Sequence, residues 1–251
     1  MPKDPADHPT SLDDPRGGGT VIQLSTVPAL AHGLYEGLKT VGQMGEFGNF
    51  GLGTFEGLDG ELILIEGKTY RFTADGCLLA TSPRDKVPFY TVTFCDDLPQ
   101  TPTPEGIRFE AFCSWLDRGL PTLNAPYAVR IDGRFETVRT RSLPRQHKPY
   151  PTMIEIRPHQ PEFEYQEISG QMIGFRFPDF LGTVNVPGYH LHFIDEARLA
   201  GGHVIDFEIS AAKVLASQRP NFQLILPTES SAFCEFEDFG LSRADIAAIE
   251  G

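Results

Sequence analysis

Three Asp-Gly pairs separate strand-like stretches, and this feature constrains the fold most strongly. The pairs are Asp59-Gly60, Asp75-Gly76 and Asp132-Gly133. A type I′ turn needs positive φ at both central residues, so each pair predicts a β-hairpin. The first pair opens the apolar run 61–65, which is typical of a strand buried on both faces. The third should join strands at 128–131 and 135–143. We therefore expect a fold rich in antiparallel strands.

Helices and a domain boundary complete the predicted organisation. Ser25 or Thr26 can cap a helix in which leucines recur at every fourth position, and 107–120 is compatible with a second helix. The leucines are Leu30, Leu34 and Leu38. Prolines cluster in 143–161, where we place the boundary. The fold class is α+β, with an N-terminal domain at 21–150, a C-terminal β-rich domain at 151–251, and a disordered leader at 1–20.

Composition excludes several classes of partner. The formal net charge of −13 argues against a nucleic-acid partner, since phosphate binding needs basic surface. The sequence has no basic cluster longer than a few residues, so binding to an anionic membrane surface is not expected. It also has no apolar run that approaches the roughly 20 residues of a membrane span. The N-terminus lacks the apolar stretch of a signal peptide, so we expect a cytoplasmic protein. The four cysteines are far apart and should be reduced structural thiols.

A group of histidines supplies the strongest functional signal. His190 and His192 alternate with apolar residues, as on a strand, so their imidazoles should share one face. His203 follows two glycines at the start of another strand-like segment. If the two segments lie side by side, three imidazoles converge and can hold Zn²⁺ with one coordination position open. The alternative is that each histidine is an ordinary core or surface residue.

Charged residues elsewhere could complete such a site. Arg139 and Arg141 lie two apart on a predicted strand, where an arginine could hold a carboxylate, although a solvated edge strand is the simpler interpretation. Glu61, at the mouth of the buried run, is a candidate ligand or acid/base and equally an ordinary turn-flanking residue. Asp206 is a candidate for orienting a histidine ligand. To Glu250, next to the C-terminus, the sequence alone assigns no role.

Four sequence blocks together resemble the α-acetolactate decarboxylase family. The blocks are 51–62 (GLGTFEGLDGEL), 138–142 (VRTRS), 188–193 (GYHLHF) and 201–204 (GGHV). They occur in the family's order, and the resemblance runs from about Gln23 to Pro227. It implies the decarboxylation of 2-acetolactate to acetoin and CO₂, and a homodimer. It also implies a two-part architecture, in which a mixed N-terminal sheet and a smaller C-terminal β-barrel-like domain enclose the metal site.

Roles for individual residues follow from the same resemblance. The zinc ligands would be the three histidines, His190, His192 and His203. Arg141 would face the substrate, Glu61 would be a glutamate of the site, and Thr54 would line it. Family members place a glutamate of the C-terminal tail near the metal, for which Glu250 is the candidate.

The implied mechanism needs no organic cofactor. Loss of CO₂ from a 3-oxo acid leaves electrons on the ketone oxygen, and Zn²⁺ would stabilise the enediolate that forms. Arg141 would orient the substrate or stabilise developing charge, and Glu61, Glu250 or a metal-ordered water molecule would deliver the proton. Two alternatives stay open: a cupin-type metalloprotein, since 190–196 imitates that fold's first motif, and a non-catalytic module with a structural metal.

Overall fold

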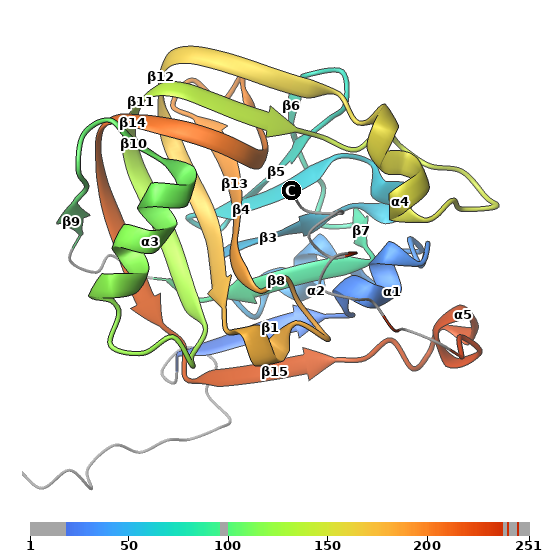
Figure 1. Ribbon diagram of the computed structural model, residues 1–251. Coiled ribbons are helices and arrows are strands. Elements are labelled where there is room, and N and C mark those ends of the chain that lie inside the picture. Colours follow the sequence, from blue (N-terminus) through green and yellow to red (C-terminus); the bar gives the residue numbers. More distant parts are fainter. Residues whose placement is uncertain (1–18, 96–99, 238–239, 241–244, 246–251) are drawn as a thin grey trace, which may run out of the picture.

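Two β-sheets form most of the protein (Figure 1). The computed structural model describes residues 19–95, 100–237, 240 and 245. The first sheet has the order β15-β1-β8-β3-β4-β5-β6 among the described residues. Its strands are β1 (Thr20–Leu24), β3 (Phe50–Thr54), β4 (Glu61–Ile65), β5 (Lys68–Phe72), β6 (Leu78–Ala80), β8 (Phe89–Thr93) and β15 (Asn221–Ile225). All neighbours are antiparallel except β1 and β15, which are parallel.

In the part of the chain that the structure describes, the second sheet contains four longer strands that close into a ring, together with two short ones. It contains β9 (Thr101–Pro102), β10 (Ile107–Arg108), β11 (Tyr127–Arg141), β12 (Glu162–Phe177), β13 (Gly188–Asp195) and β14 (Gly201–Gln218). β14 pairs with β11, β11 with β12 and β12 with β13. β13 then pairs with β14, so these four strands form a ring of hydrogen-bonded neighbours. A small two-stranded sheet joins β2 (Lys39–Thr40) to β7 (Lys86–Val87).

Short helices cover the ends of the sheets. They are α1 (Val27–Ala31), α2 (Val41–Gly45), α3 (Phe109–Gly119), α4 (Met153–Ile156) and α5 (Ser231–Cys234), with 3₁₀ turns η1 (Glu56–Leu58), η2 (Arg157–His159) and η3 (Asp179–Leu181). Helix α3 packs Phe112 against the ring of strands. Figure 1 shows α1 and α4 near one end of the first sheet, and their buried side chains belong to one cluster. None of the described helices is long and apolar enough to cross a membrane.

The two sheets share a hydrophobic core. Buried side chains of β3 and β4 pack in one cluster with those of β11, β12 and β13. The cluster includes Phe50, Leu52, Ile63, Ile65, Ala128, Ile173, Phe175 and Ile194. β4 is buried along its whole length, as its apolar run predicted. Burial of this interface by the hydrophobic effect fixes the first sheet against the second, which positions the groups described below.

The helix predicted after Thr26 is shorter than the leucine spacing indicated. Thr26 caps it as expected, because its hydroxyl oxygen accepts a hydrogen bond from the backbone N–H of Ala29. The helix ends at Ala31, so Leu34 and Leu38 lie outside it. The second predicted helix is confirmed as α3 at 109–119.

The Asp-Gly pairs mark strand connections in two of three cases. Asp59-Gly60 and Asp75-Gly76 lie between paired antiparallel strands, although Asp59 has φ −76° and so does not form a type I′ turn. The third prediction was wrong, because Asp132-Gly133 lies inside the continuous strand β11. A Cβ on Gly133 would lie 2.4 Å from the carbonyl oxygen of Ala211. That glycine therefore serves close strand approach, which produces the same dipeptide without a turn.

The α+β class with dominant antiparallel strands agrees with the structure. The sheets do not divide the chain at one point. β11 precedes the boundary predicted at residue 150 and yet belongs to the second sheet, whereas β15 returns to the first. The division into 21–150 and 151–251 stays a prediction about folding units, and the leader at 1–20 lies outside the described residues except for Gly19 and Thr20.

Candidate metal centre and active site

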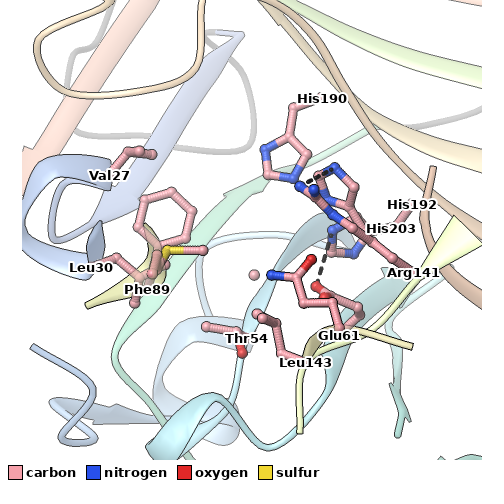
Figure 2. A pocket seen from close by; sticks show the side chains of 13 residues that line it. Val27, Leu30, Thr54, Glu61, Phe89, Arg141, Leu143, His190, His192 and His203 are labelled. Atoms are coloured by element: carbon pink, nitrogen blue, oxygen red, sulfur yellow. Dashed lines mark hydrogen bonds and ion pairs between the residues drawn. The ribbon is translucent and has the colours of Figure 1, made fainter. Parts of the chain in front are cut away.

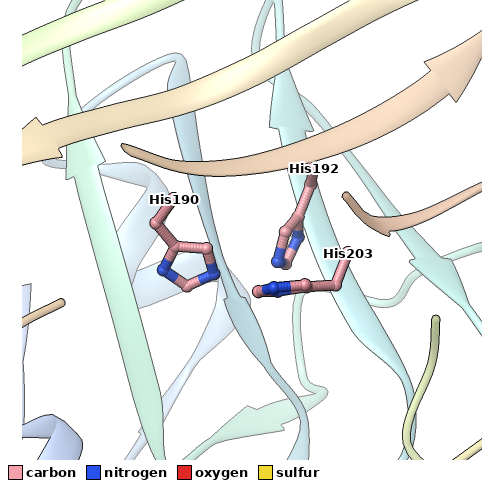
Figure 3. Close-up of side chains that lie close together, drawn as sticks. All are labelled: His190, His192 and His203. Carbon is pink, nitrogen blue, oxygen red and sulfur yellow. The ribbon is translucent and has the colours of Figure 1, made fainter. Parts of the chain in front are cut away.

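Three histidines converge where β13 and β14 pair (Figure 3). His190 and His192 lie two apart on β13, and His203 lies directly opposite His192 on β14. Opposite residues of antiparallel strands project from the same face, which explains the convergence. One nitrogen from each ring can be chosen so that all lie within 4.8 Å of one another. The spacing of the sequence thus predicted this cluster correctly.

Burial keeps the imidazoles of β13 neutral. Desolvation lowers the pKa of His190 to about 3, and the nearby Arg141 guanidinium lowers it further. The pKa of His192 also lies well below its usual value, first because of burial and second because of His190. Neutral imidazole is the form that binds metal ions, so both rings are ready to act as ligands at neutral pH.

His192 has a fixed tautomer. Its Nδ1 lies 2.9 Å from the carbonyl oxygen of Leu62, which can only accept, so Nδ1 carries the proton. Its Nε2 makes no hydrogen bond with any described residue and lies 3.5 Å from Oε2 of Glu61. A buried lone pair facing a carboxylate oxygen is stabilised by a cation. This orphaned nitrogen, with two further imidazoles beside it, fits a metal ion such as Zn²⁺.

Glu61 and Thr54 enter the site from the first sheet. They are opposite residues of β4 and β3, and both are buried. The hydroxyl of Thr54 donates to the carbonyl oxygen of Gly60 at 2.8 Å, which ties the end of β3 to the turn before Glu61. Glu61 is therefore placed by a central strand and a hydrogen-bonded turn. An ordinary turn-flanking role, which the sequence left open, does not describe a carboxylate buried beside His192.

Arg141 enters from the second sheet. It is the last residue of β11 and pairs in register with His203, and its Nη2 lies 3.2 Å from Nε2 of that ring. β11 is hydrogen-bonded on both sides, so the solvated edge strand considered from the sequence was wrong here. Arg139, in contrast, is exposed and forms an ion pair with Glu162. The structure thus separates two arginines that the strand pattern alone could not distinguish, and it agrees with the resemblance, which singled out Arg141.

A pocket joins these groups (Figure 2). In Figure 2 the histidines, Arg141 and Glu61 form one side, whereas Val27, Leu30 and Phe89 form the other. The full lining is Val27, Leu30, Gly53, Thr54, Glu61, Phe89, Arg141, Leu143, Met153, Gln160, His190, His192 and His203. The pocket therefore suits a small anion that also carries apolar groups.

Two of the residues predicted for the site are not among the described residues that line the pocket. Asp206 is not among the residues that line the pocket; it accepts a hydrogen bond from the N–H of Phe207 and lies 3.9 Å from Arg108. The group that orients His192 is instead the carbonyl of Leu62. Glu250 lies outside the described residues.

Sequence reasoning missed the apolar side of the pocket and Gln160. The apolar side chains come from three separate places, α1, β8 and the segment 143–153. No local pattern marks them, because each resembles a core residue. Gln160 lies within the proline cluster that was interpreted as a domain boundary. Gln160 comes just before β12, which pairs with the strand of Arg141, and this position was the only indication that it could reach the site.

Comparison with known proteins assigns the family. The family model for alpha-acetolactate decarboxylase matches residues 21–238. The alpha-acetolactate decarboxylase of Methylococcus capsulatus is 41% identical over 91% of this chain and 86% of its own length. That of Bacillus subtilis is 37% identical over 92% and 91%.

A solved structure agrees with the sequence relatives. The crystal structure of alpha-acetolactate decarboxylase from Bacillus subtilis strain 168 superimposes with a TM-score of 0.89 at 36% identity, covering 92% of this chain and 99% of that one. The likeness therefore extends over the whole fold and includes both sheets. This chain belongs to the alpha-acetolactate decarboxylase family and is a carboxy-lyase.

Proposed function

We propose that this protein is a zinc-dependent acetolactate decarboxylase that converts 2-acetolactate to acetoin and CO₂. The observation that carries the proposal is one pocket containing three histidine candidates for metal ligands, a buried arginine and a buried glutamate. The family match supports the same reaction.

The metal would be held by His190, His192 and His203. Three protein ligands leave a coordination position for substrate, which is the arrangement of catalytic rather than structural zinc sites. When bound, Zn²⁺ supplies a Lewis acid that accepts negative charge developing on substrate oxygen. The carbonyl of Leu62 would support this site, because its hydrogen bond with Nδ1 fixes the orientation of the His192 ring.

Arg141 would bind and orient the substrate. Its guanidinium carries a permanent charge and several donors, and it lies in the pocket at 6% exposure. Held away from water, it would attract the carboxylate of 2-acetolactate strongly. The apolar side chains across the pocket would contact the two methyl groups of the substrate. The carboxylate of the substrate would therefore face Arg141, and its methyl groups would face the apolar side of the pocket.

The proton balance requires an acid in the pocket. Breaking the bond from C2 to the carboxylate releases CO₂ and leaves the electron pair as an enediolate, which takes up one proton on carbon to give acetoin. Among the residues that line the described pocket, Glu61 is the one with a carboxyl group, and its Oε2 lies 3.5 Å from Nε2 of His192. Glu250 from the C-terminal tail is the second candidate, and Thr54 would line the site beside Glu61.

Further parts of the proposal concern the whole molecule. The ring of β11, β12, β13 and β14 would constitute the small β-barrel-like part, with the metal site between it and the first sheet. Residues 21–150 and 151–251 would be the two units. The enzyme would act as a homodimer in the cytoplasm.

The test is acetoin formation from racemic 2-acetolactate. Purified protein is assayed as isolated, after chelation, and after zinc is restored. We expect activity to disappear on chelation and to return with zinc. A folded, zinc-loaded protein that forms no acetoin would contradict the proposal. Restoration by iron with oxygen consumption would instead favour an oxygenase of the cupin type.

A further inference from the structure

Gln160 brings an unsatisfied acceptor to the pocket. Its side chain lines the cavity that contains the histidines, and its Oε1 is buried without a hydrogen-bond partner among the described residues. A buried amide oxygen without a donor costs free energy, and native proteins rarely keep one unless a ligand or water completes it. The oxygen therefore indicates a ligand contact.

The main chain holds Gln160 next to the catalytic arginine. Its own N–H donates to the carbonyl oxygen of Arg157 at 3.2 Å, which closes the turn η2. The next residue, Pro161, accepts a hydrogen bond from the N–H of Ser142 at 3.2 Å. One step further, Glu162 pairs in register with Arg141. The position of Gln160 is thus fixed by the same strand pairing that fixes Arg141.

The amide oxygen of Gln160 can bind only a group that donates a hydrogen bond. An amide oxygen accepts and cannot donate. Ionised 2-acetolactate carries a carboxylate, a ketone and a tertiary hydroxyl, so its only hydrogen-bond donor is that hydroxyl. We propose that Gln160 contacts the substrate and accepts a hydrogen bond from its tertiary hydroxyl. This inference rests on the proposed function, because it uses the donor inventory of that substrate.

A fixed hydroxyl would position the bond that breaks. The electron pair of the C2–carboxylate bond enters the ketone π system, so that bond must stand out of the ketone plane. Arg141 can hold the carboxylate, but one contact leaves rotation about C2 free. A second contact at the hydroxyl, from Gln160, would restrict that rotation and favour the reactive geometry. Gln160 would therefore affect both binding and turnover.

Binding of two acids that the enzyme cannot decarboxylate tests the contact directly. 2-Hydroxy-2-methylbutanoate carries the hydroxyl, and 2-methylbutanoate lacks it. Their dissociation constants are measured by calorimetry on the zinc-loaded parent, on Gln160→Met and on Gln160→Glu. Gln160→Met removes the acceptor at similar length, whereas Gln160→Glu keeps an acceptor oxygen. For each protein, the ratio of the two dissociation constants reports the contribution of the hydroxyl group. A change in the binding of the carboxylate affects both acids equally and cancels from that ratio.

We expect the preference for the hydroxy acid to fall roughly tenfold in Gln160→Met and to stay near the parental value in Gln160→Glu. In acetoin formation, Gln160→Met should show lower kcat and higher KM, with zinc content and Tm unchanged. An unchanged preference in both variants would overturn the proposal. Should Gln160→Met unfold, a lost preference in Gln160→Glu would overturn it equally. Failure of the proposed function is distinct, since the parent itself would then form no acetoin.

Discussion

Nε2 of His192 faces Oε2 of Glu61 at 3.5 Å, and the proton of the imidazole is on the opposite nitrogen, held by Leu62. His192 therefore presents the lone pair of Nε2 to the carboxyl group of Glu61. We expect Glu61→Gln to lower kcat by about 100-fold or more, because general acid–base groups contribute on that scale. Steady-state acetoin formation checks this, with Glu66→Gln, an exposed residue next to β4, as the control. Parental kcat in Glu61→Gln, with loss of activity in Glu250→Gln, would transfer the acid role to the tail.

Arg141→Ala should lower kcat/KM by about 100-fold or more while zinc stays bound, since a buried charge-assisted contact to the substrate is lost. Arg139→Ala is the matched control, from the same strand but exposed. It should retain parental kinetics. Kinetics and metal analysis are measured on both variants. Loss of zinc from Arg141→Ala would mean that this arginine maintains the metal site instead.

Substitution of a single histidine should release the metal. His190→Gln, His192→Gln and His203→Gln each remove one of the three converging side chains that would hold the metal. Zinc bound per chain, measured by mass spectrometry of the metal, should fall in each variant together with activity. His147→Gln, at an exposed position, should keep both. Full zinc occupancy in all three variants would place the metal elsewhere.

Gly174→Ala should disturb the metal site through the backbone. A Cβ at Gly174 would lie 1.9 Å from the carbonyl oxygen of His190 on the neighbouring strand. β13 must then move, at a cost of about 1–3 kcal/mol for an overpacked position. We expect a lower Tm and weaker zinc binding. Gly119→Ala, where an added Cβ meets no atom within 4 Å, is the control and should lower neither.

Cys113 should resist alkylation at pH values where other thiols react. Burial, followed by the charge of Asp117, raises the pKa of its thiol to about 12. The raised pKa moves formation of the reactive thiolate to higher pH, so little exists at pH 8. Cys77 and Cys234 are exposed free thiols and serve as internal references. Iodoacetamide labelling followed by mass spectrometry should modify the references first between pH 7 and 9. Equal labelling of Cys113 would show that its thiol is accessible and ionised.

Local patterns predicted the parts of the site that depend on strand geometry. His190 and His192 share a face because strand residues alternate, and no long-range information is needed for that. The burial of β4 followed equally from its apolar run. The strand pattern alone did not distinguish Arg141 from Arg139, because their difference arises from packing against His203 on β14 and from contact with Glu162.

The missed features depend on distant parts of the chain. The carbonyl that orients His192 belongs to Leu62, separated by 130 positions. Gln160 becomes a site residue only through the pairing of β12 with β11. Gly133 resembled a turn residue because close approach of strands and positive φ both select glycine. Such ambiguities are resolved by tertiary contacts and not by local sequence.

The parallel pairing of β15 with β1 limits how the pocket can open. The chain leaves the first sheet after β8 and returns to it at β15, so it crosses between the sheets twice. Glu61 lies on one sheet and the histidines on the other, and the two walls are tethered by covalent chain on both sides of the second sheet. Because two chain segments connect the sheets, the sheets cannot separate freely. Admission of substrate and escape of CO₂ should therefore depend on small movements of α1 and α4, which contribute Val27, Leu30 and Met153 to the pocket lining, while the sheets stay together.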